Sequence, residues 1–344
     1  MTYSLTDAIA SSITLVQNNQ VPFIRGGIGI GKTSRVKKEI AEGWKRHTNA
    51  KDVRVIYFPC GVVERGDITI YALKDGELVP FVTNALPKLE EGVAYVILFD
   101  DYTKSDNSID APVASLVLER TLFGTDYKLN DNCCIVFTGN PLKSRAGDRE
   151  LPSSLLNRIV TIDVEIKKDD FTSWKQWAFQ NGVHPTVIAY LNNFWATRFV
   201  QDKDETGASA TPRSFASVGK IFDQLTNQTF LPIVSGLIGR GTAVELQAFS
   251  KLVSDLPDFQ SIFDNPKTAT PLTKVESLYL TIQAFVTRIN TNDEIESAII
   301  YLKETCSSNE FATSFVRDLL LARPDLVECQ AISRFKTENA SFKV

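Results

Sequence analysis

The sequence holds few of the residues from which metal centres and disulfide frameworks are built. Among its 344 residues there are two histidines, His47 and His184, and an odd number of cysteines without a Cys-x-x-Cys pair. A chain of this length does not need disulfide staples, so we expect reduced thiols, and the small number of His and Cys residues argues against a structural zinc site. The cysteines are Cys60, Cys133, Cys134, Cys306 and Cys329.

Long apolar runs and an excess of one charge are also missing. No run approaches the roughly 18 apolar residues that could span a bilayer, and the first residues lack a basic segment followed by an apolar one. We therefore expect no membrane association and a cytoplasmic protein. The formal net charge is 37 − 41 = −4. It divides evenly, as 19 − 21 = −2 for residues 1–165 and 18 − 20 = −2 for 166–344, which argues against a broad nucleic-acid coat.

The first half of the chain alternates short β-branched or aromatic runs with helical patterns. This alternation is typical of a parallel sheet flanked by helices, so we predict an α/β fold with a doubly wound parallel five-stranded sheet. Asp75-Gly76 between apolar flanks predicts a hairpin of 68–73 with 77–81, and a second hairpin is expected around 123–129. The expected strands are 22–25, 53–58, 94–99, 134–138 and 159–164, with crossover helices over 32–46 and 111–122.

After Glu165 helical periodicity replaces the strand pattern. Loops are expected at 207–211 and 258–273, which concentrate Gly, Pro, Ser, Thr and Asn. At about 150 residues per domain the length suggests two domains, three at most. The predicted divisions are 1–165, 166–255 and 256–344, the last two all-helical. The expected helices are 170–180, 185–195, 212–225, 242–253, 272–288, 293–304 and 310–322.

A glycine-rich segment lies between the first predicted strand and the first crossover helix. It matches G-x-x-x-x-G-K-[ST], in which glycine backbone wraps around phosphate oxygens and the helix N-terminus adds partial positive charge. Lys32 is expected to reach the β- and γ-phosphates, and Thr33 to ligate Mg²⁺. A glycine-rich turn without a ligand is the alternative. The predicted nucleotide-binding residues are Gly26, Gly27, Ile28, Gly29, Ile30, Gly31, Lys32, Thr33 and Ser34.

Two carboxylates, Asp100 and Asp101, follow the apolar strand 94–99. A buried strand can direct one acid to the Mg²⁺ shell while its neighbour polarises water for attack on the γ-phosphate. We assign Asp100 to the metal and Asp101 to the water. Paired acids after a strand are more often a helix cap or a solvated turn, and the phosphate-binding loop upstream is what favours the catalytic interpretation.

These motifs resemble those of the AAA+ ATPases. The strand 133–138 and the following Gly-Asn-Pro resemble sensor 1, which implies that Asn140 orients the attacking water. Residues 151–158, Leu-Pro-Ser-Ser-Leu-Leu-Asn-Arg, resemble the arginine-finger segment, which implies that Arg158 reaches the γ-phosphate of a neighbouring subunit. Residues 207–213 resemble sensor 2, which implies that Arg213 lies over its own subunit's phosphates, at the start of a helical lid.

The two hairpins, the order Gly-Asn-Pro then Leu-Pro…Asn-Arg, and the run 116–120 resemble the MoxR branch of this family over roughly residues 15–250. The resemblance implies an ATP- and Mg²⁺-dependent ring, a hexamer, that remodels or matures a protein partner carrying a von Willebrand factor A domain. Two alternatives stay open: an AAA+ ATPase that remodels DNA or RNA through a locally basic pore, and a scaffold that ATP orders without turnover. The second arises because the family usually has Glu where this chain has Asp101, one methylene shorter.

Overall fold

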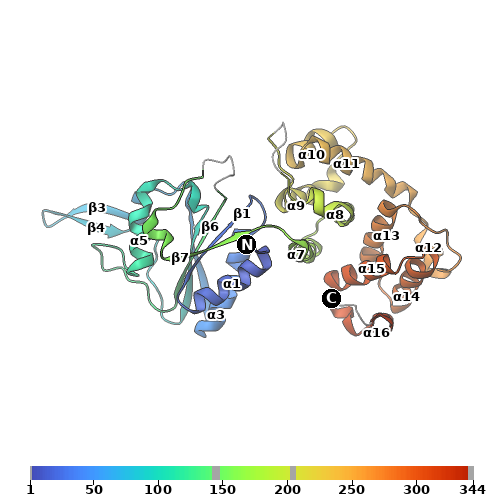
Figure 1. Cartoon of the computed structure of the whole chain (residues 1–344), viewed down its shortest axis with the longest axis horizontal. Coiled ribbons are helices and arrows are strands. Elements are labelled where there is room, and N and C mark those ends of the chain that lie inside the picture. The colour runs from blue at the N-terminus through green and yellow to red at the C-terminus, as the bar shows by residue number, and fades with distance from the viewer. Residues whose placement is uncertain (1, 142–147, 202–206, 340–344) are drawn as a thin grey trace. The chain divides into compact units, whose positions relative to one another are not determined.

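The computed structural model describes residues 2–141, 148–201 and 207–339. It divides into two compact units, Met1–Asp170 and Phe171–Val344 (Figure 1). All five cysteines carry free thiols. Among the described residues, no helix combines the length and the apolar character needed to cross a membrane.

The first unit is built on a five-stranded sheet of order β2-β5-β6-β1-β7. Every neighbouring pair is parallel, which confirms the predicted α/β class and its doubly wound parallel sheet. In the parallel register Pro59 lies beside Asp100 and Arg25 beside Gly139, so the carboxyl ends of these strands meet at one edge. The strands are β1 (Val21–Gly26), β2 (Asp52–Pro59), β5 (Val93–Asp100), β6 (Cys133–Gly139) and β7 (Ile159–Val164).

Helices cover both faces of this sheet. The central strands β5 and β6 are buried along their whole length, as expected when both faces are packed. On one face the core joins alternate strand residues, such as Val96 and Val136, to α1 and α3; on the other it joins Ile97 and Phe137 to α5. The helices are α1 (Leu5–Gln17), α2 (Lys32–Arg35), α3 (Ala41–Thr48), α4 (Arg65–Ile68), α5 (Asp110–Leu118) and α6 (Ser153–Leu156).

The predicted crossover helix over 32–46 is present but is not uniform. A π-helical segment, η1 (Val36–Ile40), joins α2 to α3 and widens the turn in mid-helix. Short 3₁₀ turns, η2 (Tyr102–Lys104) and η3 (Asn107–Ile109), lead from β5 to α5. Helix α5 ends at Leu118, four residues before the predicted end at 122, because Arg120 has a left-handed backbone (φ 55°).

Of the two predicted hairpins, the structure contains one in full. Strands β3 (Thr69–Lys74) and β4 (Glu77–Val82) pair antiparallel around Asp75-Gly76 and extend away from the main sheet (Figure 1). Around 123–129 the expected hairpin is present only as a short antiparallel turn, in which Thr121 and Lys128 form a single bridge. The Leu122 N–H donates to the Tyr127 carbonyl at 3.2 Å, and the Leu129 N–H donates to the Arg120 carbonyl at 2.8 Å.

The second unit is helical in its described part. The prediction of a loop over 258–273 was wrong in part, because α12 lies within it, capped by the Asp258 carboxylate. The connecting turns are η4 (Phe222–Gln224), η5 (Leu252–Asp255), the π-helical η6 (Tyr301–Thr305) and η7 (Pro324–Glu328). The helices are α7 (Lys168–Gln180), α8 (Pro185–Arg198), α9 (Pro212–Ile221), α10 (Phe230–Ile238), α11 (Arg240–Lys251), α12 (Phe259–Asp264), α13 (Val275–Arg288), α14 (Asn292–Ile300), α15 (Asn309–Ala322) and α16 (Gln330–Glu338).

Candidate functional site

The loop between β1 and α2 has the backbone that its glycines allow. Gly29 and Gly31 adopt positive φ angles of 74° and 102°, which favour glycine, and Gly31 is the N-cap of α2. A Cβ on Gly26 would lie 2.9 Å from Ile30 Cδ1 and 3.0 Å from Val164 Cβ, so a side chain there would force the loop to shift. Within the same loop Ile28 is exposed, whereas Ile30 is buried and anchors the loop on the core. The chain is thus shaped to present backbone N–H groups above the sheet.

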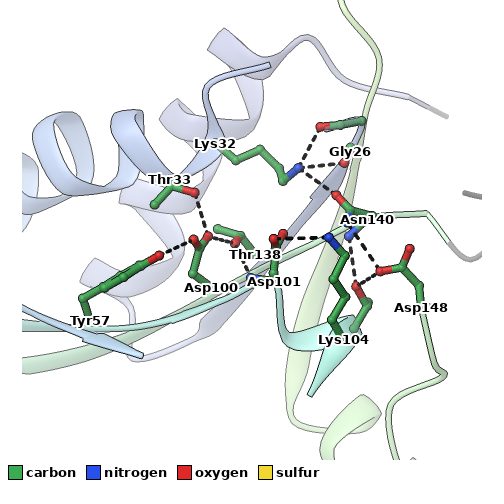
Figure 2. Close-up of polar contacts among 12 residues, drawn as sticks. Gly26, Lys32, Thr33, Tyr57, Asp100, Asp101, Lys104, Thr138, Asn140 and Asp148 are labelled. Atoms are coloured by element: carbon green, nitrogen blue, oxygen red, sulfur yellow. Dashed lines mark hydrogen bonds and ion pairs between the residues drawn. The ribbon is translucent and has the colours of Figure 1, made fainter. Parts of the chain in front are cut away.

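Lys32 lies folded over this loop. Its side chain is 6% exposed, and its Nζ donates hydrogen bonds of 2.8 Å to the carbonyl oxygens of Gly26 and Gly27 (Figure 2). A third hydrogen bond, 3.3 Å long, reaches Oδ1 of Asn140 at the end of β6. Each of these three acceptors is neutral, so an anionic phosphate oxygen is a stronger partner for the ammonium than any of them.

Asp100, at the end of β5, is the centre of a second cluster. Its side chain is buried, and both carboxylate oxygens accept hydrogen bonds (Figure 2). Thr33 Oγ1 donates to Oδ1 at 2.7 Å, Thr138 Oγ1 donates to the same oxygen, and the Tyr57 hydroxyl donates to Oδ2 at 3.0 Å. Burial, and then the nearby charge of Asp100, raise the pKa of Tyr57 to about 12, so the phenol stays protonated as a donor. Strands β2, β5 and β6 and helix α2 therefore converge on one carboxylate.

Asp101 turns away from Asp100. Its backbone is left-handed (φ 50°, ψ 40°), and its N–H is bonded to Thr138 Oγ1 at 3.2 Å. Its carboxylate, 43% exposed, lies 3.5 Å from the Lys104 ammonium. Asp is one of the few residues other than glycine that adopt this backbone readily. The left-handed conformation gives a local physical reason for a short acid here rather than Glu.

Asn140 is 1% exposed and fixed from several sides. Its backbone N–H donates to Thr103 Oγ1 at 3.2 Å, and its Nδ2 donates to Asp148 Oδ1 at 3.4 Å. Thr103 Oγ1 donates to the same Asp148 oxygen. The amide oxygen thereby faces Lys32, so the predicted sensor residue and the predicted phosphate-binding lysine are in direct contact.

Arg149 is fastened to the residues that follow β5. The guanidinium donates to Ser105 Oγ at 2.6 Å, to the Ser105 carbonyl at 2.7 Å and to both oxygens of Asp110 at 2.6 and 3.0 Å. The Tyr102 hydroxyl also donates to Asp110, at 2.7 Å. Burial raises the pKa of Tyr102 well above its usual range, with the Asp110 hydrogen bond adding to the effect, so this hydroxyl stays protonated. The residues after β5 and those after β6 are thus fastened together.

Sequence reasoning missed several residues of this site: Tyr57, Thr138, Thr103, Asp148 and Arg149. The sequence predicts Tyr57 and Thr138 only as strand residues. The available signal was their position at the carboxyl ends of strands neighbouring β5, where polar side chains gather in an open α/β sheet.

Two predicted residues lie outside the cluster of Figure 2. Arg158 follows α6 and is exposed; within the described residues its side chain makes no hydrogen bond or ion pair. Arg213 is exposed in the first turn of α9, in the second unit, directly after Pro212. Ser34, in the first turn of α2, is exposed as well. Arg158 and Arg213 therefore remain predictions.

The residues present fit a magnesium nucleotide. A loop too tight for a Cβ at Gly26 and a lysine bonded to neutral acceptors suit a phosphate chain. Thr33 and Asp100 supply a hydroxyl and a carboxylate, which are the hard oxygen ligands that Mg²⁺ prefers. Mg²⁺ is typically bound by one or two carboxylates together with the phosphates of the substrate. Among the described residues no group of three His, Cys, Asp or Glu side chains forms an all-protein metal cage.

No protein-family model matches the chain, and no curated protein matches its sequence. Among solved structures, a point mutant of RuvB from Thermotoga maritima is 12% identical, with 97% of this chain and 87% of that chain covered and a TM-score of 0.38. NtrX from Brucella abortus is 12% identical, with 93% and 67% covered and a TM-score of 0.41. Its complex with ATP is also 12% identical, with 100% and 69% covered and a TM-score of 0.37. Similarities this low do not assign a function, which depends on the site residues themselves.

Proposed function

We propose that the chain is a magnesium-dependent ATPase of the AAA+ type. The observation that carries this proposal is the convergence at one sheet edge of Lys32 with Asn140 and of Thr33 with Asp100. Two residues come from the start of α2 and one each from the ends of β5 and β6. Phosphoryl transfer needs mainly positioning and charge stabilisation, and these four residues would provide both around a γ-phosphate.

Each residue has a role that its contacts support. Lys32 would exchange the Gly26 and Gly27 carbonyls for β- and γ-phosphate oxygens, and the N–H groups of the loop would bind the same phosphates. Thr33 and Asp100 would hold Mg²⁺, which neutralises charge on the phosphates when bound. Asn140 would release its amide oxygen from Lys32 and orient the attacking water.

Asp101 is the proposed base for that water. Its exposed carboxylate is free to turn, but its ion pair with Lys104 competes with the water for the carboxylate oxygen. We therefore propose slow turnover. The same observation favours a second candidate function, a scaffold that ATP orders with little hydrolysis.

Arg158 is the proposed finger and Arg213 the proposed sensor 2. An exposed arginine without a partner among the described residues of its own chain suits a role at a neighbouring subunit's phosphate. The assembly proposed is a homo-oligomeric ring, a hexamer, of MoxR type, acting on a protein partner with a von Willebrand factor A domain. These finer assignments depend on the motif resemblance and on the exposure of Arg158.

Phosphate release by micromolar protein, with and without Mg²⁺, tests the proposal. Arg158→Ala should keep nucleotide binding and lose about a hundredfold or more of turnover, because a finger contributes in the transition state. Arg46→Ala, which changes another exposed arginine of the first unit, is the control and should turn over like the wild type. Binding without any phosphate release would favour the scaffold, and release stimulated by added DNA would favour a nucleic-acid remodeller. Unchanged turnover in Arg158→Ala removes this residue from the mechanism.

A further inference from the structure

Tyr57 is a residue of the site that the motifs do not include. It lies near the end of β2, two positions before Pro59, which is level with Asp100 in the parallel register. Its hydroxyl donates the hydrogen bond to Asp100 Oδ2, and its ring is 42% exposed. The hydroxyl of a buried or half-buried tyrosine usually finds a hydrogen-bond partner, and here that bond fixes the position of the Tyr57 side chain.

The two oxygens of Asp100 are held in different ways. Oδ1 accepts from two hydroxyls, those of Thr33 and Thr138, so the loss of either donor leaves another. Oδ2 accepts from Tyr57. The carboxylate can rotate about its terminal torsion, which is broad and roughly two-fold, and Tyr57 opposes this rotation from the side away from Thr33.

Lys37 fixes the other side of the tyrosine ring. Its Nζ lies 3.4 Å from the centroid of the Tyr57 ring, within the range of a cation–π contact. Lys37 lies in η1, one helical turn after Thr33, so both residues reach the sheet from the same side of one continuous helix. A ring of contacts therefore joins the phosphate-binding helix to β2 through the carboxylate of Asp100. Its members are Thr33, Asp100, Tyr57 and Lys37.

We propose that Tyr57 is a positioning residue for Asp100, that Lys37 holds the Tyr57 ring, and that together they set the Mg²⁺ affinity of the nucleotide complex. The inference rests on the proposed function, since it concerns the same site. It goes further because it assigns a role in metal binding to β2 and to η1, neither of which contains a phosphate-binding residue.

The physical reason is the cost of a mobile ligand. A carboxylate held at both oxygens presents one orientation to the cation, whereas a carboxylate held at one oxygen samples several. Loss of a residue that orients a metal ligand typically weakens metal binding by about 10–100-fold. Nucleotide binding without metal depends on Lys32 and the loop N–H groups and so does not involve Tyr57.

The experiment is a Mg²⁺ titration of fluorescent-ATP binding to the full chain, with the same titration of nucleotide in EDTA. Tyr57→Phe should raise the Mg²⁺ concentration for half-maximal binding about tenfold and leave the affinity in EDTA unchanged within about twofold. Tyr71→Phe is the matched control, because Tyr71 on hairpin strand β3 is 46% exposed and its hydroxyl accepts a hydrogen bond from Arg65 of α4, away from Asp100. Lys37→Met should raise the Mg²⁺ requirement about threefold, whereas Lys38→Met, the neighbouring exposed lysine, should not change it.

The outcomes separate the two proposals. If wild-type protein binds ATP with a Mg²⁺ dependence that Tyr57→Phe leaves unchanged or makes tighter, the role of Tyr57 is wrong and the proposed function stands. Equal losses with and without Mg²⁺ in Tyr57→Phe also overturn this role, because they indicate a general disturbance of the loop. If the wild-type chain binds no nucleotide, both proposals fail. Should Tyr57→Phe not fold, the Lys37→Met and Lys38→Met pair decides the question in the same assay.

Discussion

The two units of the molecule each bury charged side chains, but they use them differently. Among the described residues, the first unit buries Lys32 at 6% exposure and Asp100 at 7%, and the second buries Lys175 at 6% and Asp318 at 0%. Asp170, the last residue of the first unit, is also buried, and its carboxylate accepts from backbone N–H groups. In the second unit the two residues pair with each other. In the first unit Lys32 is bonded to carbonyl and amide oxygens and Asp100 to hydroxyls. Burial alone therefore does not distinguish a structural charge from one held ready for a ligand.

The partners make the distinction. Asp318 on α15 accepts from Lys175 on α7, from Asn192 on α8 at 2.8 Å and from Gln283 on α13 at 2.7 Å. The carboxylate is satisfied by an ammonium and two amides in a closed core, and its donors come from both sides of the predicted boundary at 255. Lys32 and Asp100 lie at a sheet edge, where a phosphate or a cation can take the place of the carbonyl, amide and hydroxyl groups described above. We infer that Lys32 and Asp100, whose partners can be exchanged, serve chemistry. The Lys175–Asp318 ion pair, which is closed in the core, stabilises the fold of the second unit.

The largest predicted effect is at the closed pair. Asp318→Ala leaves the Lys175 ammonium buried without its counter-ion and should lower the free energy of unfolding of the second unit by about 3–5 kcal/mol. Urea denaturation followed by tryptophan fluorescence measures it, since Trp174 and Trp195 lie in this unit. Asp325→Ala is the control, because Asp325 forms a solvent-exposed pair with Arg323 and its loss should change the stability little.

The double variant Lys175→Met/Asp318→Leu sharpens this prediction. It removes both charges and replaces them with apolar side chains, so it should recover much of the loss. A double variant as unstable as Asp318→Ala would show that lost packing, and not an unpaired charge, is the cause.

The fold was predictable where local pattern and burial agree. The five strands of the main sheet are short runs rich in β-branched and aromatic residues, and the hairpin around Asp75-Gly76 has an explicit turn signal. Helix α10 was not predicted, because Phe-Leu-Pro-Ile-Val-Ser-Gly-Leu-Ile contains Pro and Gly, which usually mark turns, although Phe230, Val234 and Ile238 recur at helical spacing and are buried. At 123–129 the sequence indicates an antiparallel turn, but it does not indicate that the pairing is limited to one bridge.

The site was predictable to the extent that its chemistry follows a spacing. Lys32, Thr33, Asp100 and Asn140 come together as the motifs indicate. Tyr57 could not be found in this way, since its contact with Asp100 joins two strands that are 43 residues apart and depends on their register. Such contacts arise from the sheet, which a motif does not encode.

A smaller predicted effect concerns an ion pair that is neither closed in the core nor part of the candidate site. Arg25 on β1 and Asp163 on β7 form a bidentate pair, with side chains 29% and 45% exposed. The Arg25 hydrogen bond lowers the pKa of Asp163 below its ordinary value of 3.8. Because the folded-state pKa is the lower one, the pair contributes stability above about pH 4 and loses it as the pH falls through the folded-state value.

Asp163→Asn tests this contribution. Partial exposure limits the pair to about 0.5–1 kcal/mol. The difference in unfolding free energy between wild type and variant should have this size at pH 7 and shrink towards zero as the pH falls through the folded-state pKa of Asp163. A difference that stays constant over this range would show that the carboxylate charge does not matter at this position.

The central claim is that Lys32 is held for a ligand and Lys175 for the fold. Equilibrium binding of fluorescent ATP with Mg²⁺ to wild type, Lys32→Met and Lys175→Met, each measured at a temperature where the variant is folded, tests it most directly. The account predicts that Lys32→Met lowers the affinity at least about a hundredfold, or about 2.7 kcal/mol, with its unfolding midpoint close to wild type, and that Lys175→Met binds normally but is less stable. Equal affinities for the wild type and Lys32→Met would contradict the account.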